Sequence, residues 1–373
     1  MSSDQIASSE MNTKPTGSGP YKISEIKRNS VGIISSYELD SNKNFVLGRP
    51  NIKKLIMKFY PSEKDLLTAY QKGEVETINA VTPQELEKIK TSNSVKTLNL
   101  PRIFGVFLNQ NNAKVLTKKE IRQALNLSVD RKKIIDEVLK GYGAELFSPL
   151  PAGTFGALLK SETDAYSLES AKGLLDKNGW KMNTDEQVLE KKIGKELFKF
   201  SFSISTSDAP ELKETAYLLK SMWEKIGAKV EVKVFEMGDL TQNVIRPRKY
   251  DALLFGEIVG RDPDPFAFWH SSQRNDPGLN VALYTNIKAD KLLEEARSAQ
   301  DEAKRADKYK EFQEEVSKDL PAIFLFSPKF IYVIPKNLKG TDEMESVTVP
   351  SERFSTIYKW YKSTDKVWKI FAK

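Results

Sequence analysis

The sequence predicts an α/β protein with two lobes. Two separate segments, residues 53–81 and 198–236, each read as strand, helix, strand. In both, apolar residues alternate in the strands and recur every three to four positions in the helix. Such units bury the faces of a sheet against their helices, and two of them far apart in a chain of 373 residues indicate two lobes.

The first unit is marked by the ends of its helices. Residues 53–61 (KKLIMKFYP) read as a strand, and Ser62 then precedes a helix with Asp65 three positions later. This is the spacing of a capping box, in which a side chain satisfies the free amides of the first turn. Gly73 ends the helix, and after a short strand Thr82 precedes the next one.

Residues 118–140 contain the clearest helical period of the chain. Gly141 ends the segment. The pattern predicts one amphipathic helix or a kinked pair of helices. The residues expected on its apolar face are Ile121, Leu125, Val129, Ile134 and Val138.

The second unit continues into a further strand. After strand 198–205, a helix that ends at Gly227 and strand 228–236, residues 251–259 (DALLFGEIV) form a largely apolar run. A strand buried on both faces of a parallel sheet has this composition. Farther on, we expect a charged helix over 288–320 and then an apolar extended run, broken by Pro328.

Composition excludes several classes of function. There is no cysteine and one histidine, His270, which excludes thiolate nucleophiles, iron–sulfur clusters and zinc held by cysteine. The 58 basic residues are interleaved with 51 acidic ones rather than gathered in a stripe, so no nucleic-acid partner is expected. No P-loop, HExxH or GxSxG motif occurs, and no cofactor or metal is predicted.

The densest unusual segment is residues 256–286 (GEIVGRDPDPFAFWHSSQRNDPGLNVALYTN), which follows the apolar strand. Ligands of open α/β sheets bind beyond the carboxyl ends of strands. There Trp269 could supply flat contact area, Arg261 or His270 could meet a carboxylate, and Asn280 could bond amides. The alternative is an Asp-Pro turn with Trp269 packed in a core. Asp262 and Asp264 are a weak acid–base or metal-binding signal, and carboxylates beside prolines in a turn more often cap backbone groups.

Residues 102–112 (RIFGVFLNQNN) form a second candidate segment. Large apolar residues alternate along it, and it ends in amides, which indicates a strand that leads to a binding edge or to a plain polar turn. At the N-terminus, residues 1–16 are rich in serine, asparagine and threonine and lack the apolar core of a signal peptide, so we expect a disordered leader.

Three segments resemble the family 5 extracellular solute-binding proteins of ABC importers, the oligopeptide and dipeptide binders and their relatives. GSGPYKI at 17–23 looks like the opening motif of the family, and residues 56–86 look like its strand–helix–strand stretch with a Gly-Glu pair. Residues 107–151 resemble the family segment that contains an Asp-Arg pair, here Asp130-Arg131. This last segment is the most specific of the three.

The resemblance implies a type II periplasmic-binding fold, two lobes with a cleft between which the chain crosses twice. We expect a leader at 1–16, the first part of lobe I at 17–105, lobe II at 106–328 and a return to lobe I at 329–373. Ligand would lie in the cleft and be enclosed by hinge closure. In peptide-binding relatives, an extended peptide is held by strand-like hydrogen bonds.

The chain departs from the family pattern in two ways. The export signal, often with a lipidated cysteine, and a long segment that starts the first lobe do not precede residue 17. Peptide binders also carry an aspartate three positions before the acidic-Pro pair, where it meets the peptide's α-amine. That position is Val259 here, so Asp262 or Asp264 would have to replace the charge.

The sequence therefore predicts a non-catalytic, extracytoplasmic binding protein that captures a peptide or similar small organic ligand. We expect it to act as a monomer with an ABC permease in the membrane. Two alternatives remain: a hydrolase that uses His270 with Ser271 or Ser272, or a structural or signalling remnant that does not bind ligand. The predicted ligand-binding residues are Phe104, Asn109, Arg261, Asp262, Trp269, His270, Asn280 and Tyr284.

Overall fold

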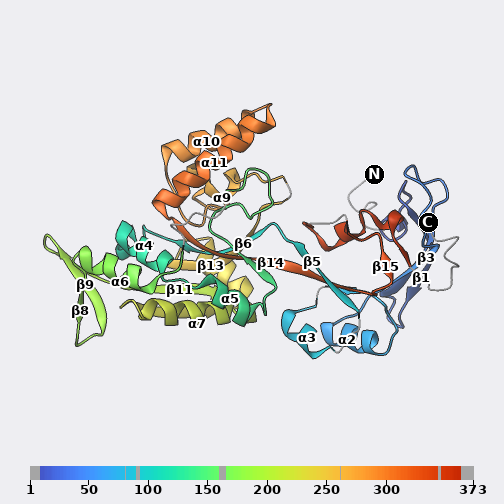
Figure 1. Cartoon of the computed structure of the whole chain (residues 1–373), viewed down its shortest axis with the longest axis horizontal. Helices are drawn as coiled ribbons and strands as arrows, with labels where there is room; N and C mark the ends of the chain where they lie inside the picture. The colour runs from blue at the N-terminus through green and yellow to red at the C-terminus, as the bar shows by residue number, and fades with distance from the viewer. Residues whose placement is uncertain are drawn as a thin grey trace. The chain divides into compact units, whose positions relative to one another are not determined.

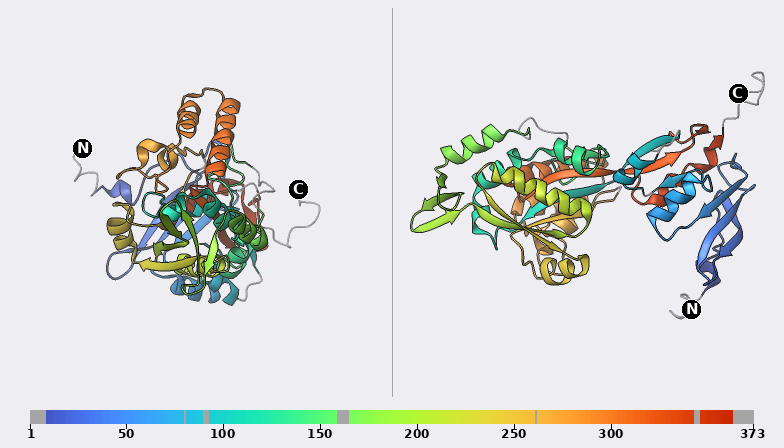
Figure 2. Two further views of the ribbon diagram at one scale, coloured as in Figure 1. Left: turned by 90° about the vertical axis from the view of Figure 1, so that its left-hand side faces the viewer. Right: turned by 90° about the horizontal axis from the view of Figure 1, so that it is seen from below.

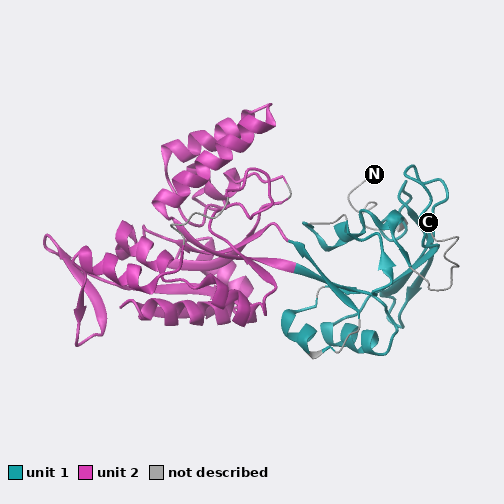
Figure 3. Ribbon diagram, in the orientation of Figure 1, with its two compact units in different colours: residues 1–99, 330–373 teal, residues 100–329 magenta. Residues whose placement is uncertain are grey.

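The chain of the computed structural model divides into two units, which Figure 3 shows in two colours. Unit 1 comprises residues 1–99 and 330–373, and unit 2 comprises residues 100–329. The structure describes residues 9–79, 81–89, 93–158, 165–260, 262–342 and 346–362. The expected leader therefore lies partly outside the described residues, and residues Glu10–Asn12 form a 3-10 turn, η1.

Unit 2 is built on a mixed sheet with the strand order β12-β11-β13-β6-β14 (Figure 1). β11 is parallel to both β12 and β13, whereas β6 is antiparallel to β13 and to β14. A short strand, β7, pairs with β14. The bounds are β6 Arg102–Leu108, β7 Gly143–Glu145, β11 Ser201–Ser207, β12 Lys229–Phe235, β13 Ala252–Ile258 and β14 Ala322–Ile334.

Helices cover both faces of this sheet (Figures 1 and 2). The first face contacts α4 (Lys119–Leu127), α5 (Arg131–Val138), α6 (Leu168–Lys177) and α7 (Pro210–Glu224). The second contacts η4 (Leu240–Ile245), α9 (Phe266–Trp269), α10 (Ile287–Ser298) and α11 (Glu302–Asp319). Successive strand residues alternate between the two cores: Leu254 packs in the first and Leu253 in the second.

Smaller elements complete unit 2. A three-stranded antiparallel sheet is formed by β8 (Lys181–Asn183), β9 (Val188–Ile193) and β10 (Glu196–Lys199). The remaining short helices are η2 (Lys114–Thr117), α8 (Met237–Asp239) and η5 (Ser271–Gln273).

The kinked pair predicted over 118–140 is confirmed as α4 and α5. The break falls at Ser128–Asp130, and the Asp130 side chain accepts a hydrogen bond from the Lys133 amide, which caps α5. All five residues of the predicted apolar face are fully buried.

Two predictions near the C-terminus are wrong. The charged segment 288–320 forms two helices, α10 and α11, because Asp301 caps a new helix by accepting from the Lys304 amide. Pro328 does not break the apolar run, and β14 continues to Ile334. Pro328 lies opposite Gly143, and the next amide, that of Lys329, donates to the Tyr142 carbonyl oxygen at 3.0 Å. Pro328 therefore occupies a non-hydrogen-bonded position of this antiparallel ladder, where its missing N–H interrupts no pairing.

Unit 1 contains a three-stranded antiparallel sheet and two short helices. The Ser62 and Thr82 side chains cap the helices, as predicted, by accepting from the amides of Asp65 and Glu85. β4 and β5 each pair with β14. The bounds are β1 Tyr21–Arg28, β2 Ile34–Ser41, β3 Lys54–Lys58, α2 Glu63–Gln71, β4 Ile78–Asn79, α3 Pro83–Lys88, β5 Ser94–Asn99, β15 Leu338–Lys339, η6 Pro350–Phe354, η7 Ile357–Lys359 and β16 Tyr361–Lys362.

Candidate functional site

The segment between β13 and α10 carries most of the predicted ligand-binding residues. Its two short helices, α9 and η5, pack beside α10 on the second face of the unit 2 sheet. Arg261 lies outside the described residues, so its predicted role stays a prediction.

Trp269 is a core residue of unit 2. Its side chain is 1% exposed, and its ring lies 5.7 Å from Phe324 and 6.1 Å from Phe107, measured between ring centroids. In this conformation Trp269 is therefore packed in a core, the alternative to a ligand contact, because a fully covered ring offers no surface to a ligand. Its role in ligand binding stays a prediction.

Asn280 stabilises the segment between β13 and α10 through hydrogen bonds of its side chain, and it has no exposed surface. Its Nδ2 donates to the carbonyl oxygens of Trp269, His270 and Tyr284 at 3.2, 3.1 and 3.0 Å. Its Oδ1 accepts from the Tyr284 amide at 3.0 Å. An amide whose donors and acceptor are all used by backbone groups holds a loop in one conformation.

Tyr284 extends the same buried cluster. Its hydroxyl donates to Asp319 Oδ2 at 2.8 Å, and its ring meets Trp269 edge-on at 6.3 Å. Burial, and then the bond to the Asp319 carboxylate, raises the pKa of Tyr284 far above its usual value. The hydroxyl is therefore a permanent donor at physiological pH, and it ties the segment to the end of α11.

His270 lies at the start of η5. Its ring stacks on Phe266 with centroids 4.1 Å apart, and its Nδ1 lies 2.7 Å from Ser272 Oγ and accepts from the Ser272 amide at 3.1 Å. Its Nε2 lies 3.4 Å from Glu294 Oε1. The imidazole thus caps its own short helix and faces a carboxylate of α10.

Asp262 and Asp264 each have a cationic partner. Asp264 forms a two-pronged contact with the Arg297 guanidinium, whose Nε lies 3.1 and 3.0 Å from the two carboxylate oxygens. Asp262 pairs with Arg305. Both carboxylates therefore have a cationic partner within unit 2, and Val259 is buried. The predicted role of Asp262 or Asp264 in replacing the charge missing at Val259 stays a prediction.

Phe104 lies near the start of β6, and Asn109 directly follows the end of the same strand. Phe104 stacks on Phe326 at 5.1 Å and covers Gly256, where an added Cβ would approach the Phe104 ring to 2.7 Å. Asn109 follows the other end, where its Nδ2 donates to the Arg248 carbonyl oxygen at 3.0 Å and its amide to the Asp251 carbonyl oxygen. The eight predicted residues therefore do not form one cluster.

Glu257 is a buried polar residue that the sequence-based site did not include. It is 5% exposed, and neither carboxylate oxygen has a hydrogen-bond partner in the described part of the chain. A lone glutamate within the apolar run DALLFGEIV was the available signal. Burial raises its pKa well above the usual value.

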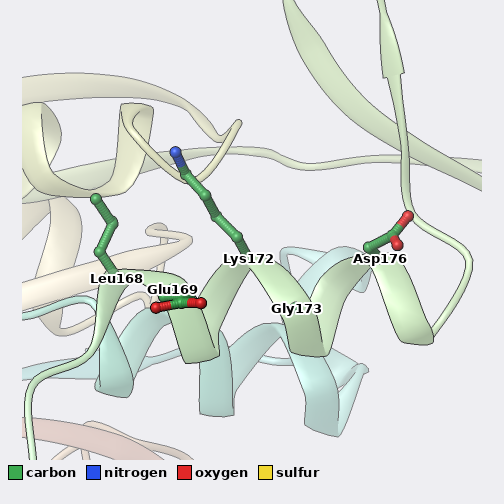
Figure 4. A pocket seen from close by; sticks show the side chains of 5 residues that line it. All are labelled: Leu168, Glu169, Lys172, Gly173 and Asp176. Atoms are coloured by element: carbon green, nitrogen blue, oxygen red, sulfur yellow. The ribbon is translucent and has the colours of Figure 1, made fainter.

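Other kinds of site receive little support. The hollow in Figure 4 is an open surface along α6, lined by Leu168, Glu169, Lys172, Gly173 and Asp176, all of one helix. Among the described residues, no group of three or more histidine, aspartate or glutamate side chains is arranged to hold a metal ion. Within the same residues, no helix is long and apolar enough to cross a bilayer.

Comparison with known proteins identifies a family to which this sequence and fold are similar. The family model described as "Bacterial extracellular solute-binding proteins, family 5 Middle" matches residues 2–280. The oligopeptide-binding protein AppA of Bacillus subtilis is 29% identical over 334 residues, which cover 88% of this chain and 59% of AppA. The dipeptide-binding protein of Escherichia coli is 22% identical over 335 residues, 89% of this chain and 59% of that protein.

Solved structures agree with these relatives. The AppA structure from Bacillus subtilis with a nonapeptide has a TM-score of 0.64 at 26% identity and covers 96% of this chain and 69% of its own. An ABC transporter substrate-binding protein from Sinorhizobium meliloti has a TM-score of 0.78 at 17% identity over 94% of this chain and 69% of its own, which supports the fold alone. The chain spans about three fifths of the curated relatives it matches. Its sequence motifs, its fold and the match over residues 2–280 show that this chain belongs to the family 5 bacterial extracellular solute-binding proteins.

Proposed function

We propose that this chain is the solute-capturing component of an ABC importer and holds a small organic ligand without transforming it. The observation that carries the proposal is the family match over residues 2–280, because the matched relatives are named as binding proteins. A binding protein needs a shaped, covered site and no reactive side chain.

A peptide is the proposed ligand class. AppA of Bacillus subtilis is named as an oligopeptide binder, and one of its structures contains a nonapeptide. Relatives named for dipeptides, heme and nickel are also matched, so the fold accommodates other cargo. We further propose that the protein works outside the cytoplasm, as a monomer that delivers ligand to a membrane permease.

A hydrolase remains the second candidate because His270 Nδ1 lies 2.7 Å from Ser272 Oγ. A general base must reach the hydroxyl that it activates, and this pair does. The same nitrogen also accepts the Ser272 amide, however, which supports a capping role instead.

Thermal unfolding with pools of tri- to nonapeptides tests the proposal. Ligand that binds only the folded state raises the melting temperature, by an amount that grows with the logarithm of the ratio of its free concentration to its Kd. We expect a pool of peptides to raise the melting temperature, and His270→Ala to change the size of this shift at most, with no peptide cleaved by either protein. Cleavage that His270→Ala abolishes would support the hydrolase, and the absence of any shift would favour a remnant that does not bind.

A further inference from the structure

The loop between β2 and β3, residues 42–53, presents two adjacent apolar side chains to solvent. Val46 is 87% exposed and Leu47 is 61% exposed, and both lie in the middle of the loop. Single exposed apolar residues are common on protein surfaces, whereas a pair at the tip of a loop is typical of a contact site. This exposed pair, Val46 and Leu47, makes the loop a candidate interaction surface of unit 1.

The residues beside the exposed pair anchor the loop to unit 1. Asn42 is buried, and its Nδ2 donates to the Gly19 carbonyl oxygen at 2.9 Å. The Phe45 ring packs edge-on against Tyr358 with centroids 5.4 Å apart, and the Gly48 amide donates to the Phe45 carbonyl oxygen at 3.0 Å, which closes the turn across the pair. The exposed pair therefore belongs to an ordered loop that holds it toward solvent.

Basic residues flank the exposed pair on both sides. The loop contains Lys43, Arg49 and Lys53 and no acidic residue. All three side chains are exposed, and none of them pairs with an acidic side chain among the residues that the structure describes. The nearest acid in the sequence, Asp40, lies opposite Lys54 in the sheet. The loop thus combines an apolar tip with positive charge that no described acidic residue compensates.

The turn between β1 and β2, residues 29–33, lacks this combination. Its Val31 and Ile33 are 76% and 64% exposed, so it is about as apolar as the loop at the other end of β2. The turn itself contains no charged residue, and the guanidinium of the preceding Arg28 donates to a carbonyl oxygen of the turn at 2.8 Å. Two apolar surfaces of similar exposure therefore differ in the charge around them.

We propose that the loop 42–53 docks unit 1 on an anionic lipid surface. The exposed pair enters the interfacial layer of the bilayer, and Lys43, Arg49 and Lys53 pair with lipid phosphate groups. Charge complementarity selects this partner, because apolar side chains bury at the boundary between headgroups and acyl chains while basic side chains meet anionic lipids. The inference goes beyond the capture of a solute and does not depend on which solute is captured.

The charge of the loop also argues against a second copy of the chain as its partner. A two-fold contact through this loop would place Lys43, Arg49 and Lys53 of one copy against the same residues of the other. Like charges brought together in an interface are unfavourable. A surface of lipid phosphates has the opposite sign and meets the same residues with attraction.

Docking requires both the charge and the apolar pair. Attraction between exposed basic residues and lipid phosphates is screened by salt and decays within a Debye length of the surface. Even one acyl chain gives only marginal, reversible membrane binding, so two apolar side chains alone do not hold a protein on a neutral bilayer. The docking is therefore reversible and weakens as the salt concentration rises.

Sedimentation of the purified chain with lipid vesicles tests this docking. The probes are vesicles of phosphatidylcholine alone and vesicles of an equal mixture of phosphatidylcholine and phosphatidylglycerol. One variant removes the exposed pair, a second removes the charge, and a third is the matched control in the turn at the other end of β2. They are Val46→Ser with Leu47→Ser; Lys43→Gln with Arg49→Gln and Lys53→Gln; and Val31→Ser with Ile33→Ser. All of these positions are exposed, so each variant should keep its melting temperature.

We expect the wild type and the control variant to bind the mixed vesicles at least about tenfold more tightly than the neutral ones. The other two variants should each lose about tenfold in affinity for the mixed vesicles. Failure of the wild type to bind vesicles, equal binding to both kinds of vesicle, or an equal loss in the control variant overturns the inference. Each of these results leaves the proposed function standing, since no peptide is involved.

A fluorescent label reports insertion of the loop directly. The chain has no cysteine, so Leu47→Cys and Ile33→Cys each accept a single environment-sensitive dye at positions of similar exposure. We expect the emission to shift to the blue for the label at position 47 alone, and with the mixed vesicles alone. A shift at both positions or at neither contradicts insertion of this loop. A shift that grows with protein concentration without vesicles would assign the loop to a contact between copies and would also overturn the inference.

Discussion

The sheet of unit 2 and the β1–β3 sheet of unit 1 bury their apolar side chains to very different extents. In unit 2, six of the seven residues of β11 are buried, and each face of the sheet packs against its own hydrophobic cluster. In β1, β2 and β3, the one buried side chain is that of Ser36. Val31, Ile33, Ile56 and Phe59, in or beside these strands, are each about half exposed or more.

The difference shows that stability is unevenly distributed in this chain. A sheet gains most of its stability by packing an apolar face on another layer, and two- or three-stranded sheets without such a layer are marginal. The sheet of unit 2 packs against a hydrophobic cluster on each of its faces, whereas the β1–β3 sheet is stabilised by strand pairing and by ion pairs at its surface. We therefore expect amide hydrogens of β1–β3 to exchange well before those of β11 and β13.

The largest expected effect is that of Trp223→Ala in the first core of unit 2. Trp223 has no exposed surface, its Nε1 donates to the Leu125 carbonyl oxygen at 3.1 Å, and its ring lies 5.6 Å from Phe202. Its removal should destabilise unit 2 by about 3–5 kcal/mol, through lost burial and the cavity left behind. Urea unfolding followed by amide exchange measures this, and a loss below about 1 kcal/mol would contradict a dense unit 2 core.

Asn280→Ala should have an intermediate effect confined to residues 266–286. The variant leaves three buried carbonyl oxygens and the Tyr284 amide without their partner, which costs about 1–3 kcal/mol. We expect faster amide exchange in this segment and unchanged exchange in β1–β3. Faster exchange in both regions would show that the two are coupled.

A smaller effect should follow from acid in the β1–β3 sheet. Glu38 accepts from Lys27 at 2.7 Å and from Lys54 at 3.0 Å, and these bonds lower the pKa of Glu38 to about 2. A carboxyl with a lowered folded pKa stabilises the fold above its ordinary pKa and loses that contribution as the pH falls toward about 2. Exchange in β1–β3 should accelerate over this range in the wild type, and Glu38→Gln should show no such acceleration.

The smallest effect is expected for Ile56→Ala in β3. Ile56 is 55% exposed, so its truncation should change the free energy of unfolding by no more than about 0.5 kcal/mol. A loss comparable to that of a core residue would mean that this face of the β1–β3 sheet is covered in solution, and it would remove the contrast between the two sheets.

Local patterns predicted most elements of this fold correctly. The helical period of residues 118–140 was predictable because its apolar side chains all pack in the same core. The caps were local as well, since the Ser62, Thr82 and Asp130 side chains each bind an amide three residues away. Of the two errors, the division of 288–320 comes from the local cap at Asp301, and the continuation of β14 past Pro328 comes from tertiary context. Pro328 is tolerated because it faces β7 at a position without a hydrogen bond, and β7 is far from it in sequence.

The candidate site was harder to predict because residue types alone do not show which side chains are buried in the folded chain. Trp269, Asn280 and Tyr284 are residue types that bind ligands, but in unit 2 they bond and pack with one another. Glu257 was not among the predicted residues, since an apolar strand suggests packing. That neither of its oxygens has a hydrogen-bond partner among the described residues becomes visible only when the sheet is assembled. The direction of each strand also separated Asn109 from the segment beyond β13.

The most direct test of the account is the native mass spectrum of the chain after incubation with a mixture of short peptides. We expect complexes with one peptide per chain, which dissociate to the unmodified protein and intact peptides on activation. A spectrum that contains the bare chain alone at every peptide concentration, or peptides shortened by incubation, would contradict capture without chemistry.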